Sequence, residues 1–443
     1  MSQEGIETAQ PVRQPLGAWG FIGLALACSA ISYVDRQVIS LMVEPLKAAM
    51  HLNDAQIGLL QGLAFSLCYA VGALPLAFLI DTGNRVNIAS ACVAVWSLAT
   101  GACGLATNYL GFLLARAGTA LSEAAFSPAV LSIVPDIFPR NRIARATAVY
   151  LLGPSIGTGL ALTGGGWLLG RFERWGGLIL PVVGQLAPWQ SVFVCLTGPG
   201  LILAALLLLL AREPERRQVL RPASADGRPD SRWGVVEIWR TGFLLPYMAG
   251  TTLIMTTQFA LSAWAPTFFV RHFAMQPHAV GQMLGPVFIV SNVAGAVVTG
   301  IVGGGGRPER AMHRVMAVVQ WGAVFVGPSA VLMTVSPGVG AAVAAYAAAG
   351  FFGSLVATLA TTPIQLSVPN AVRAQAIAIG GFILAVIGGG GGPYFVGAIS
   401  DYVFHDETAV GQSVAVVSAI ASVGGVLSLV LARTIMARRA AAT

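Results

Sequence analysis

The sequence predicts an all-α membrane protein with twelve transmembrane helices arranged in two six-helix pseudo-repeats. Of its 443 residues, 56% are hydrophobic and only 10% are charged, whereas soluble domains carry about 25% charged residues. Apolar runs of about 20 residues, long enough to span a bilayer as a helix, recur along the chain. One charged stretch divides these runs into two sets of nearly equal length. This composition excludes a soluble enzyme, a nucleic-acid-binding protein and a disulfide scaffold.

Proline, glycine and polar clusters bound the apolar segments. The runs are continuously apolar, which favours helices over the alternating strands of a barrel, and a helix satisfies its own backbone hydrogen bonds in lipid. The first six segments are 18–45, 57–80, 87–107, 109–134, 146–170 and 190–211, and the second six are 241–270, 279–303, 311–335, 339–366, 374–400 and 411–432. We therefore expect an N-terminal tail (1–17), a first bundle (18–211), a linker (212–240), a second bundle (241–432) and a C-terminal tail (433–443).

Arginine placement predicts the orientation, because Lys47 is the only lysine. Nineteen basic residues fall in segments on the same side as the N-terminus, and four fall in the opposite loops. Cytoplasmic loops carry the excess of Lys and Arg, so we expect both termini in the cytoplasm and the protein in the cell (inner) membrane. The polar N-terminal stretch lacks the apolar core of a signal peptide, and we expect no cleavage there.

Four charged residues fall well inside predicted helices of the first half: Asp35 and Arg36 in helix 1, and Arg116 and Glu123 in helix 4. Ionisable residues within a membrane are functional candidates because their burial is costly. Arg116 and Glu123 are seven residues apart and share a helix face, whereas the neighbours Asp35 and Arg36 point about 100° apart. In one workable arrangement Arg36 reaches a helix 4 carboxylate and Asp35 faces a central cavity. The four residues form either a proton-coupling set or a static salt-bridge cluster.

Two further features concern movement. Asp81 and Arg85, in the loop between helices 2 and 3, can latch the two halves in one state or simply cap a turn. Glycine clusters occupy equivalent helices of the two halves, around Gly153–Gly159 in helix 5 and at Gly388–Gly392 in helix 11. We expect them chiefly to permit close helix packing, with a moving hinge as the second interpretation.

A substrate cavity is expected between the halves. Its predicted polar lining is neutral on the second-half side and comprises Thr256, Gln258, Trp264, Asn292, Thr361 and Gln365. With Arg36 and Arg116 opposite, such a cavity suits a molecule with an anionic head and an apolar body. The chain has no GxxxxGK[ST] phosphate loop and no HExxH metal pair. We therefore expect no metal and no cofactor, with the proton gradient as the energy source.

Several stretches resemble the major facilitator superfamily, and within it the bacterial Spinster-like proteins. They include SYVDRQVISLMVEPLKAAM, ARAGTALSEAAFSPAVLSIVPDIFPRNRIARA and GGPYFVGAISDYV. The resemblance implies proton coupling by Asp35 and Glu123, with Arg36 as their partner. The arginine that the superfamily carries in helix 4 corresponds to Arg116. The superfamily's helix 2–3 motif, GxLaDrxGR, is altered here around Asp81 and Arg85 at Ala77, Ile80, Thr82 and Asn84.

The resemblance further implies an amphipathic substrate, because eukaryotic Spinster-like members are associated with lysolipids and sphingoid lipids. We expect a proton-coupled secondary active transporter that moves such a substrate by alternating access, not an enzyme. The alternatives are a proton-coupled symporter of an organic anion, such as a sugar acid or aromatic acid, and a receptor or scaffold that does not transport. Expected partners are the substrate, protons and membrane lipids, with no nucleic acid and a monomeric chain.

Overall fold

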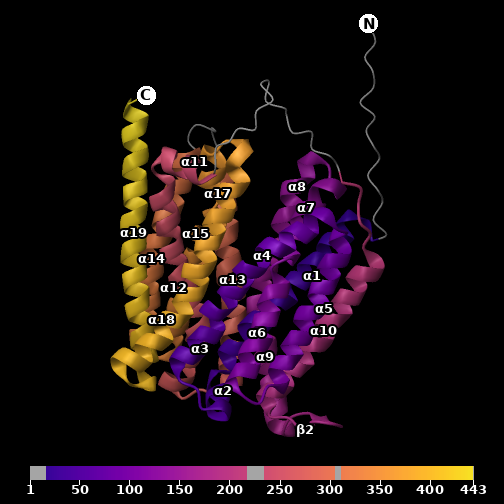
Figure 1. Cartoon of the computed structure of the whole chain (residues 1–443). Coiled ribbons are helices and arrows are strands. Elements are labelled where there is room, and N and C mark those ends of the chain that lie inside the picture. Colours follow the sequence, from indigo (N-terminus) through magenta and orange to yellow (C-terminus); the bar gives the residue numbers. More distant parts are fainter. Residues whose placement is uncertain (1–15, 217–233, 305–310, 443) are drawn as a thin grey trace.

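A computed structural model confirms the all-α membrane fold. It describes residues 16–216, 234–304 and 311–442, so most of the predicted N-terminal tail, much of the linker and part of the loop before helix 9 lie outside the described residues. Within these ranges, twelve helical segments are long and apolar enough to cross a membrane. Figure 1 shows α8, α11 and the end of α19 at one end of the molecule, and α2, α3 and β2 at the other. We name these the inner end and the outer end, after the orientation expected from the arginine distribution.

The first half contains spans 1 to 6, and several of them are built from two helical pieces. Their elements are α1 (Gly17–Gln37), the 3-10 turn η1 (Val38–Leu41), α2 (Val43–Met50), α3 (Asp54–Gln61), α4 (Leu63–Thr82), α5 (Arg85–Leu105), α6 (Tyr109–Glu123), α7 (Phe126–Ile137), α8 (Arg140–Tyr150), α9 (Gly153–Trp175) and α10 (Pro188–Leu210). A two-stranded antiparallel hairpin, β1 (Ile179–Leu180) and β2 (Gly184–Gln185), connects α9 to α10.

The second half contains spans 7 to 12. Its elements are α11 (Gly234–Thr241), α12 (Leu244–Phe273), α13 (Pro277–Gly304), α14 (Ala311–Val335), α15 (Val339–Leu359), α16 (Thr362–Ser367), α17 (Asn370–Ile383), the π-helical η3 (Leu384–Gly391), α18 (Gly392–Ile399), the π-helical η4 (Ser400–Phe404), the 3-10 turn η5 (Glu407–Ala409) and α19 (Val410–Ala442). Four of the five successive glycines of span 11 lie in η3, where the helix is widened rather than broken.

The two halves meet along seams where glycines let backbones approach closely. Between α9 and α13, a methyl group at Gly166 would lie 2.9 Å from the carbonyl oxygen of His278. Between span 2 and span 11, a methyl group at Gly62 would collide with the carbonyl of Gly390. Small residues at such crossings allow dense packing where no hydrophobic force drives helices together in lipid. The predicted packing role of the glycines in helices 5 and 11 therefore agrees with these contacts.

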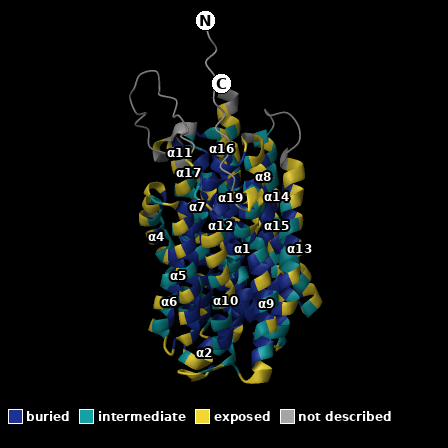
Figure 2. Cartoon of the chain, turned by 90° about the vertical axis from the view of Figure 1, so that its right-hand side faces the viewer, coloured by how far each residue is buried: buried dark blue, intermediate teal, exposed yellow. Residues whose placement is uncertain are grey.

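The distribution of buried and exposed residues is typical of a membrane protein. Figure 2 shows buried residues running through the middle of the bundle and exposed residues along its outer surface. Many exposed residues are large and apolar, such as Val71, Phe78 and Ile301, with 69%, 68% and 73% of their surface accessible. In a bilayer these side chains contact lipid. Most buried polar residues are serines and threonines, and the described buried charged residues, which belong to the contacts presented next, are Asp35, Lys47, Asp54, Arg85, Arg116, Glu123 and Asp136.

Candidate functional site

A central cavity of about 420 Å³ lies between the two halves, within the usual size range of small-molecule sites. Both halves contribute to its wall. The first half supplies Tyr33, Arg36, Gln37, Gln61, Phe65 and Tyr69, and the second half supplies Met255, Gln258, Phe259, Phe288 and Asn292, among others. Most of this lining is aromatic or apolar, and amide groups provide the neutral polar contacts. Arg36 is the one charged residue in the described lining.

Arg36 is held by one carboxylate and three aromatic rings. Its Nη2 donates to Oε2 of Glu123 at 2.7 Å. The centre of its guanidinium group lies 4.3 Å from the ring centroid of Phe65, 4.8 Å from that of Tyr33 and 5.5 Å from that of Tyr69. Such cation–π contacts stabilise a partly desolvated cation. The side chain remains 24% exposed, so part of its charge faces the cavity.

Glu123 lies where span 4 is interrupted. Helix α6 ends at Glu123 and α7 begins at Phe126, and discontinuous helices are typical of ion and substrate sites in transporters. The side chain of Glu123 is 2% exposed. Its Oε2 binds Arg36, whereas its Oε1 is buried and has no hydrogen-bond partner. Glu123 therefore uses only one of its two carboxylate oxygens to bind Arg36, and this pair joins spans 1 and 4.

Asp35 does not face the cavity, which corrects the arrangement expected from the sequence. Its surface is fully buried, and neither carboxylate oxygen has a hydrogen-bond partner among the described residues. The reason is the angle of about 100° between consecutive side chains of a helix. Because Arg36 turns toward the cavity and Glu123, its neighbour Asp35 turns into the first bundle. An ionised carboxylate without partners is costly in such a place.

Arg116 is also absent from the cavity wall, contrary to expectation. It is 1% exposed and donates to the backbone carbonyls of Asp35 at 3.2 Å and Arg36 at 3.4 Å. These carbonyls lie in the last turn of α1, just before the 3-10 turn η1. The last carbonyl groups of an α-helix have no amide partner within the helix. A cation at a helix C-terminus is also favoured by the helix dipole. Arg116 thus holds the backbone that carries Asp35 and Arg36.

The predicted substrate residues divide into two groups. Gln258 and Asn292 line the cavity as expected. Thr256, Trp264, Thr361 and Gln365 are not part of its wall. The hydroxyl of Thr256 donates to the backbone of its own helix at Thr252, and the buried indole of Trp264 donates to the carbonyl of Pro393 at 2.8 Å. A helical pattern shows which residues are polar but not which side of a helix faces the partner bundle.

Sequence reasoning also missed cavity residues of the first half, including Gln37, Gln61 and the aromatic group around Arg36. The amide of Gln37 donates to the carbonyl of Ser262 at 2.5 Å, a direct contact between the halves. A signal was present, because Tyr33 lies three residues before Arg36 and Phe65 lies four residues before Tyr69. Residues at these spacings share a helix face.

The predicted inner latch has a different composition. Arg85 binds Asp136 and Glu213, each at 2.6 Å, and does not bind Asp81. Asp81 is exposed, and its backbone carbonyl accepts a hydrogen bond from Arg216. The described contacts of Arg85 therefore join spans 3 and 4 to the start of the linker, and they do not bridge the two halves. Asp81 and Arg85 are only four residues apart, at the end of α4 and the start of α5, but they are not partners here.

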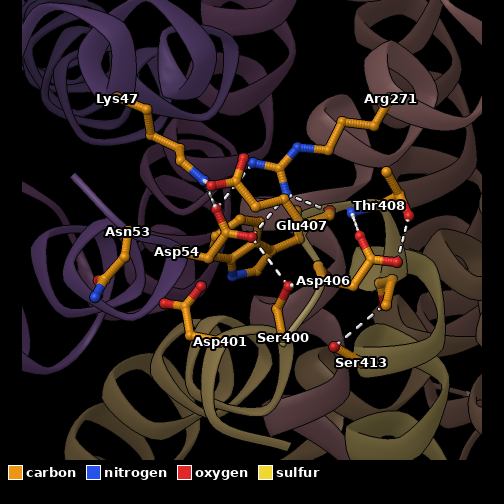
Figure 3. A network of polar contacts seen from close by, with 12 residues as sticks. Lys47, Asn53, Asp54, Arg271, Ser400, Asp401, Asp406, Glu407, Thr408 and Ser413 are labelled. Carbon is orange, nitrogen blue, oxygen red and sulfur yellow. Dashed lines mark hydrogen bonds and ion pairs between the residues drawn. The ribbon is translucent and has the colours of Figure 1, made fainter. Parts of the chain in front are cut away.

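An ion-pair network at the outer end joins the halves, and no pattern in the sequence predicted it. Its centre is Asp54 at the start of α3, which is fully buried. Asp54 accepts hydrogen bonds from Lys47, from Arg271 of α12 and from the hydroxyl of Ser400. Figure 3 shows these side chains converging on the Asp54 carboxylate. Two further contacts extend the network: Arg271 to Glu44 at 2.7 Å and Lys47 to Glu407 at 2.9 Å.

A second carboxylate near the network, that of Asp401, accepts a hydrogen bond from a backbone amide. Oδ2 of Asp401, in η4, accepts a hydrogen bond from the backbone amide of Ala55 at 2.6 Å. Ala55 lies in the first turn of α3, where amides lack helical partners. The outer ends of spans 2 and 11 are therefore joined by side-chain and backbone contacts together.

A model of the Major Facilitator Superfamily matches residues 25–393 of the chain. The chain belongs to the major facilitator superfamily. It is accordingly a multi-pass membrane protein of a transporter family, and its relatives include Spinster proteins, as the resemblance in the sequence indicated.

Two curated relatives cover most of the chain. An "MFS-type efflux pump" of Mycolicibacterium smegmatis is 27% identical over 407 residues, covering 91% of this chain and 90% of that protein. The "Sphingosine-1-phosphate transporter SPNS2" of Danio rerio is 25% identical over 410 residues, covering 88% of this chain and 77% of that protein. Among solved structures, a bacterial homologue of the human lysosomal transporter Spinster, in an inward-facing and unoccupied conformation, has a TM-score of 0.76 at 24% identity. The alignment covers 94% of this chain and 96% of that one, and this likeness concerns the fold.

Proposed function

We propose that the protein is a proton-coupled secondary active transporter of an amphipathic, lipid-like substrate with an anionic head. The observation that carries the proposal is the position of Arg36. Its guanidinium group lines the cavity and is paired with Glu123 at 2.7 Å. An anionic head that enters the cavity therefore competes with Glu123 for the same cation.

This competition couples the substrate to protons. When Glu123 is ionised it holds Arg36, and when it is protonated the pair is weakened and Arg36 becomes available to the substrate. Asp35 lies on the same turn of α1 with no hydrogen-bond partner for its carboxylate, which suits a second group that gains and loses a proton. Arg116 ties both residues to one piece of backbone, so a change at either carboxyl acts on the same segment.

The shape of the cavity favours an amphipathic ligand. Arg36 supplies one positive charge, and the amides of Gln61, Gln258 and Asn292 supply neutral polar contacts. The remaining wall includes Phe259, Phe288 and Met255, surfaces suited to a hydrocarbon chain. The relative from Danio rerio is named as a sphingosine-1-phosphate transporter, which agrees with a head of this kind.

In the proposed cycle the outer network opens and closes the outer side. Asp54, Lys47 and Arg271 hold the outer ends of the two halves together while the substrate exchanges at the inner end. Opening the outer side requires these pairs to separate as one half rocks against the other. We place the inner end in the cytoplasm of the cell, with both termini there, from the arginine distribution.

The test is uptake into proteoliposomes with an imposed pH gradient. Two radiolabelled probes are compared, a lysophospholipid series of increasing chain length and a small aromatic acid. The proposal expects pH-driven uptake of the lysophospholipid that improves with chain length and is lost in Arg36→Gln. Preference for the aromatic acid, independent of any chain, would favour the organic-anion symporter. Binding of either probe with no counterflow would indicate a receptor.

A further inference from the structure

A second cavity, of about 260 Å³, lies between α14 and α19 on the second half. It shares no lining residue with the central cavity. We name it the α14–α19 groove and define it by Gln320, Trp321 and Val324 of α14 and by Val426, Val430 and Arg433 of α19. Trp321, Val324 and Val430 are 63%, 42% and 46% exposed. Because the surface of this bundle faces lipid, the groove opens toward the bilayer.

The groove contains a cation, Arg433, that is held by a side-chain amide. Arg433 donates from Nη1 to Oε1 of Gln320 at 2.6 Å. Among the described residues no carboxylate pairs with it, and the sequences of α14 and α19 contain no Asp or Glu at all. The only charged side chains of these two helices are basic. A phosphate group is the natural complement of a guanidinium with free donors.

The depth of the groove matches the inner boundary of the membrane. About 20 helical residues cross the hydrocarbon core, and α19 begins at Val410, so Arg433 lies just beyond the core on the inner side. Toward the outer side, α14 and α19 touch at Gly327 and Ser422, and the groove begins about one turn inward of that contact. Its polar end therefore lies toward the inner boundary of the core, from which the long Arg433 side chain reaches the headgroup level, and its apolar walls run alongside acyl chains.

One wall of the groove is aromatic. Trp321 stacks on Phe325 with ring centroids 6.0 Å apart, and Phe325 stacks on Phe352 at 4.8 Å. The indole is thus held at the edge of the groove although it is largely exposed. A fixed indole beside the Arg433 guanidinium frames a space for one lipid head and the start of its chains.

We propose that the α14–α19 groove binds an anionic glycerophospholipid of the inner leaflet, with the phosphate on Arg433 and Gln320 and an acyl chain along Val324 and Val430. Basic pockets between transmembrane helices on the cytoplasmic side suit anionic headgroups. The site is separate from the central cavity, so the proposal does not depend on the transported substrate.

The test measures which lipids remain bound. The full chain is reconstituted in nanodiscs of equal parts phosphatidylcholine and phosphatidylglycerol, released, and analysed by native mass spectrometry. We expect phosphatidylglycerol to be enriched on the wild-type protein. Arg433→Gln should lower that enrichment about fivefold, since one basic residue near an anionic surface contributes about 1 kcal/mol. Arg433→Lys keeps the charge and should retain most of it.

Arg438→Gln is the matched control, because Arg438 is exposed on the same helix but does not line the groove. It should leave the enrichment unchanged, and unfolding temperatures confirm that each variant is folded. Equal enrichment in the wild type and Arg433→Gln would overturn the proposal. So would loss of bound phosphatidylglycerol in excess inorganic phosphate, which would mean that the groove binds a free anion instead.

Discussion

The guanidinium group of Arg271, from span 7, binds both carboxylate oxygens of Asp54, from span 2, at 2.6 and 2.8 Å. The two residues belong to different halves of the protein, and Asp54 is fully buried. A bidentate pair fixes geometry as well as charge. In the proposed cycle an open outer side requires these groups to separate, so we expect the pair to favour the closed outer end.

Replacing Asp54 by Asn should favour outer opening. The substitution leaves Arg271 and Lys47 near one another without their shared carboxylate, and removing one partner of a buried pair costs about 3–5 kcal/mol. We expect a cysteine introduced at the cavity residue Ser262 to react about tenfold faster or more with a membrane-impermeant thiol reagent added from the outer side. The measurement is the labelling rate in oriented vesicles, with the parent lacking the introduced cysteine as background.

The control for this experiment is Asp406→Asn. Hydrogen bonds from the side chain and the backbone amide of Thr408 lower the pKa of Asp406, so it is ionised at neutral pH as a paired carboxylate would be. It is fully exposed, and its carboxylate oxygens accept hydrogen bonds only from Thr408 among the described residues. Equal acceleration by both variants would show that the Arg271–Asp54 pair does not hold the outer end closed.

The seam between spans 2 and 11 should be intolerant of added bulk. Gly62→Ala places a methyl group against the carbonyl of Gly390, a backbone atom that cannot move aside by changing a rotamer. We expect a loss of about 1–3 kcal/mol in the free energy of unfolding, as for overpacked cores, measured by thermal denaturation in detergent. Gly23→Ala is the matched control, because its methyl group would meet nothing within 4 Å. Equal stability of the two variants contradicts close packing at this seam.

Glu123→Gln should change how ligand affinity depends on pH. In the wild type, a lysophospholipid phosphate competes with ionised Glu123 for Arg36, so its affinity should rise as pH falls and Glu123 is protonated. In Glu123→Gln the competitor is neutral at every pH, so affinity should be flat and equal to the low-pH value of the wild type. Binding titrations across a pH series in detergent measure this. If the affinity of Glu123→Gln varies with pH as steeply as that of the wild type, Glu123 is not part of the coupling mechanism.

Asp35→Asn should separate transport from its driving force. The variant cannot carry a proton at residue 35, but its amide is similar in size and Arg116 still binds the backbone carbonyl there. We expect exchange of labelled for unlabelled lysophospholipid to continue while a pH gradient no longer drives accumulation. Asp81→Asn, at an exposed residue outside the cavity, should keep both. Gradient-driven accumulation by Asp35→Asn would exclude Asp35 from coupling.

The helices could be predicted because hydropathy and length are local properties of the chain, and the twelve spans follow from them directly. The contact between Arg36 and Glu123 could be anticipated for a similar reason, since helical spacing limits where two charged residues can point; its role in coupling stays a prediction. The burial of Asp35 within the first bundle could not be predicted, because the sequence does not show whether Asp35 or Arg36 faces the cavity. The outer network brings together residues as distant as Lys47 and Glu407, so no local pattern could reveal it.

The central claim is that Asp35 and Glu123 gain and lose protons within the working pH range. Infrared difference spectroscopy of the purified protein tests it without knowledge of the substrate, because a protonated carboxyl group has its own carbonyl band. The account predicts carboxyl bands that change between acidic and alkaline pH, with one component lost in Asp35→Asn and another in Glu123→Gln. Spectra with no titrating carboxyl band, or bands identical in both variants and the wild type, would contradict it.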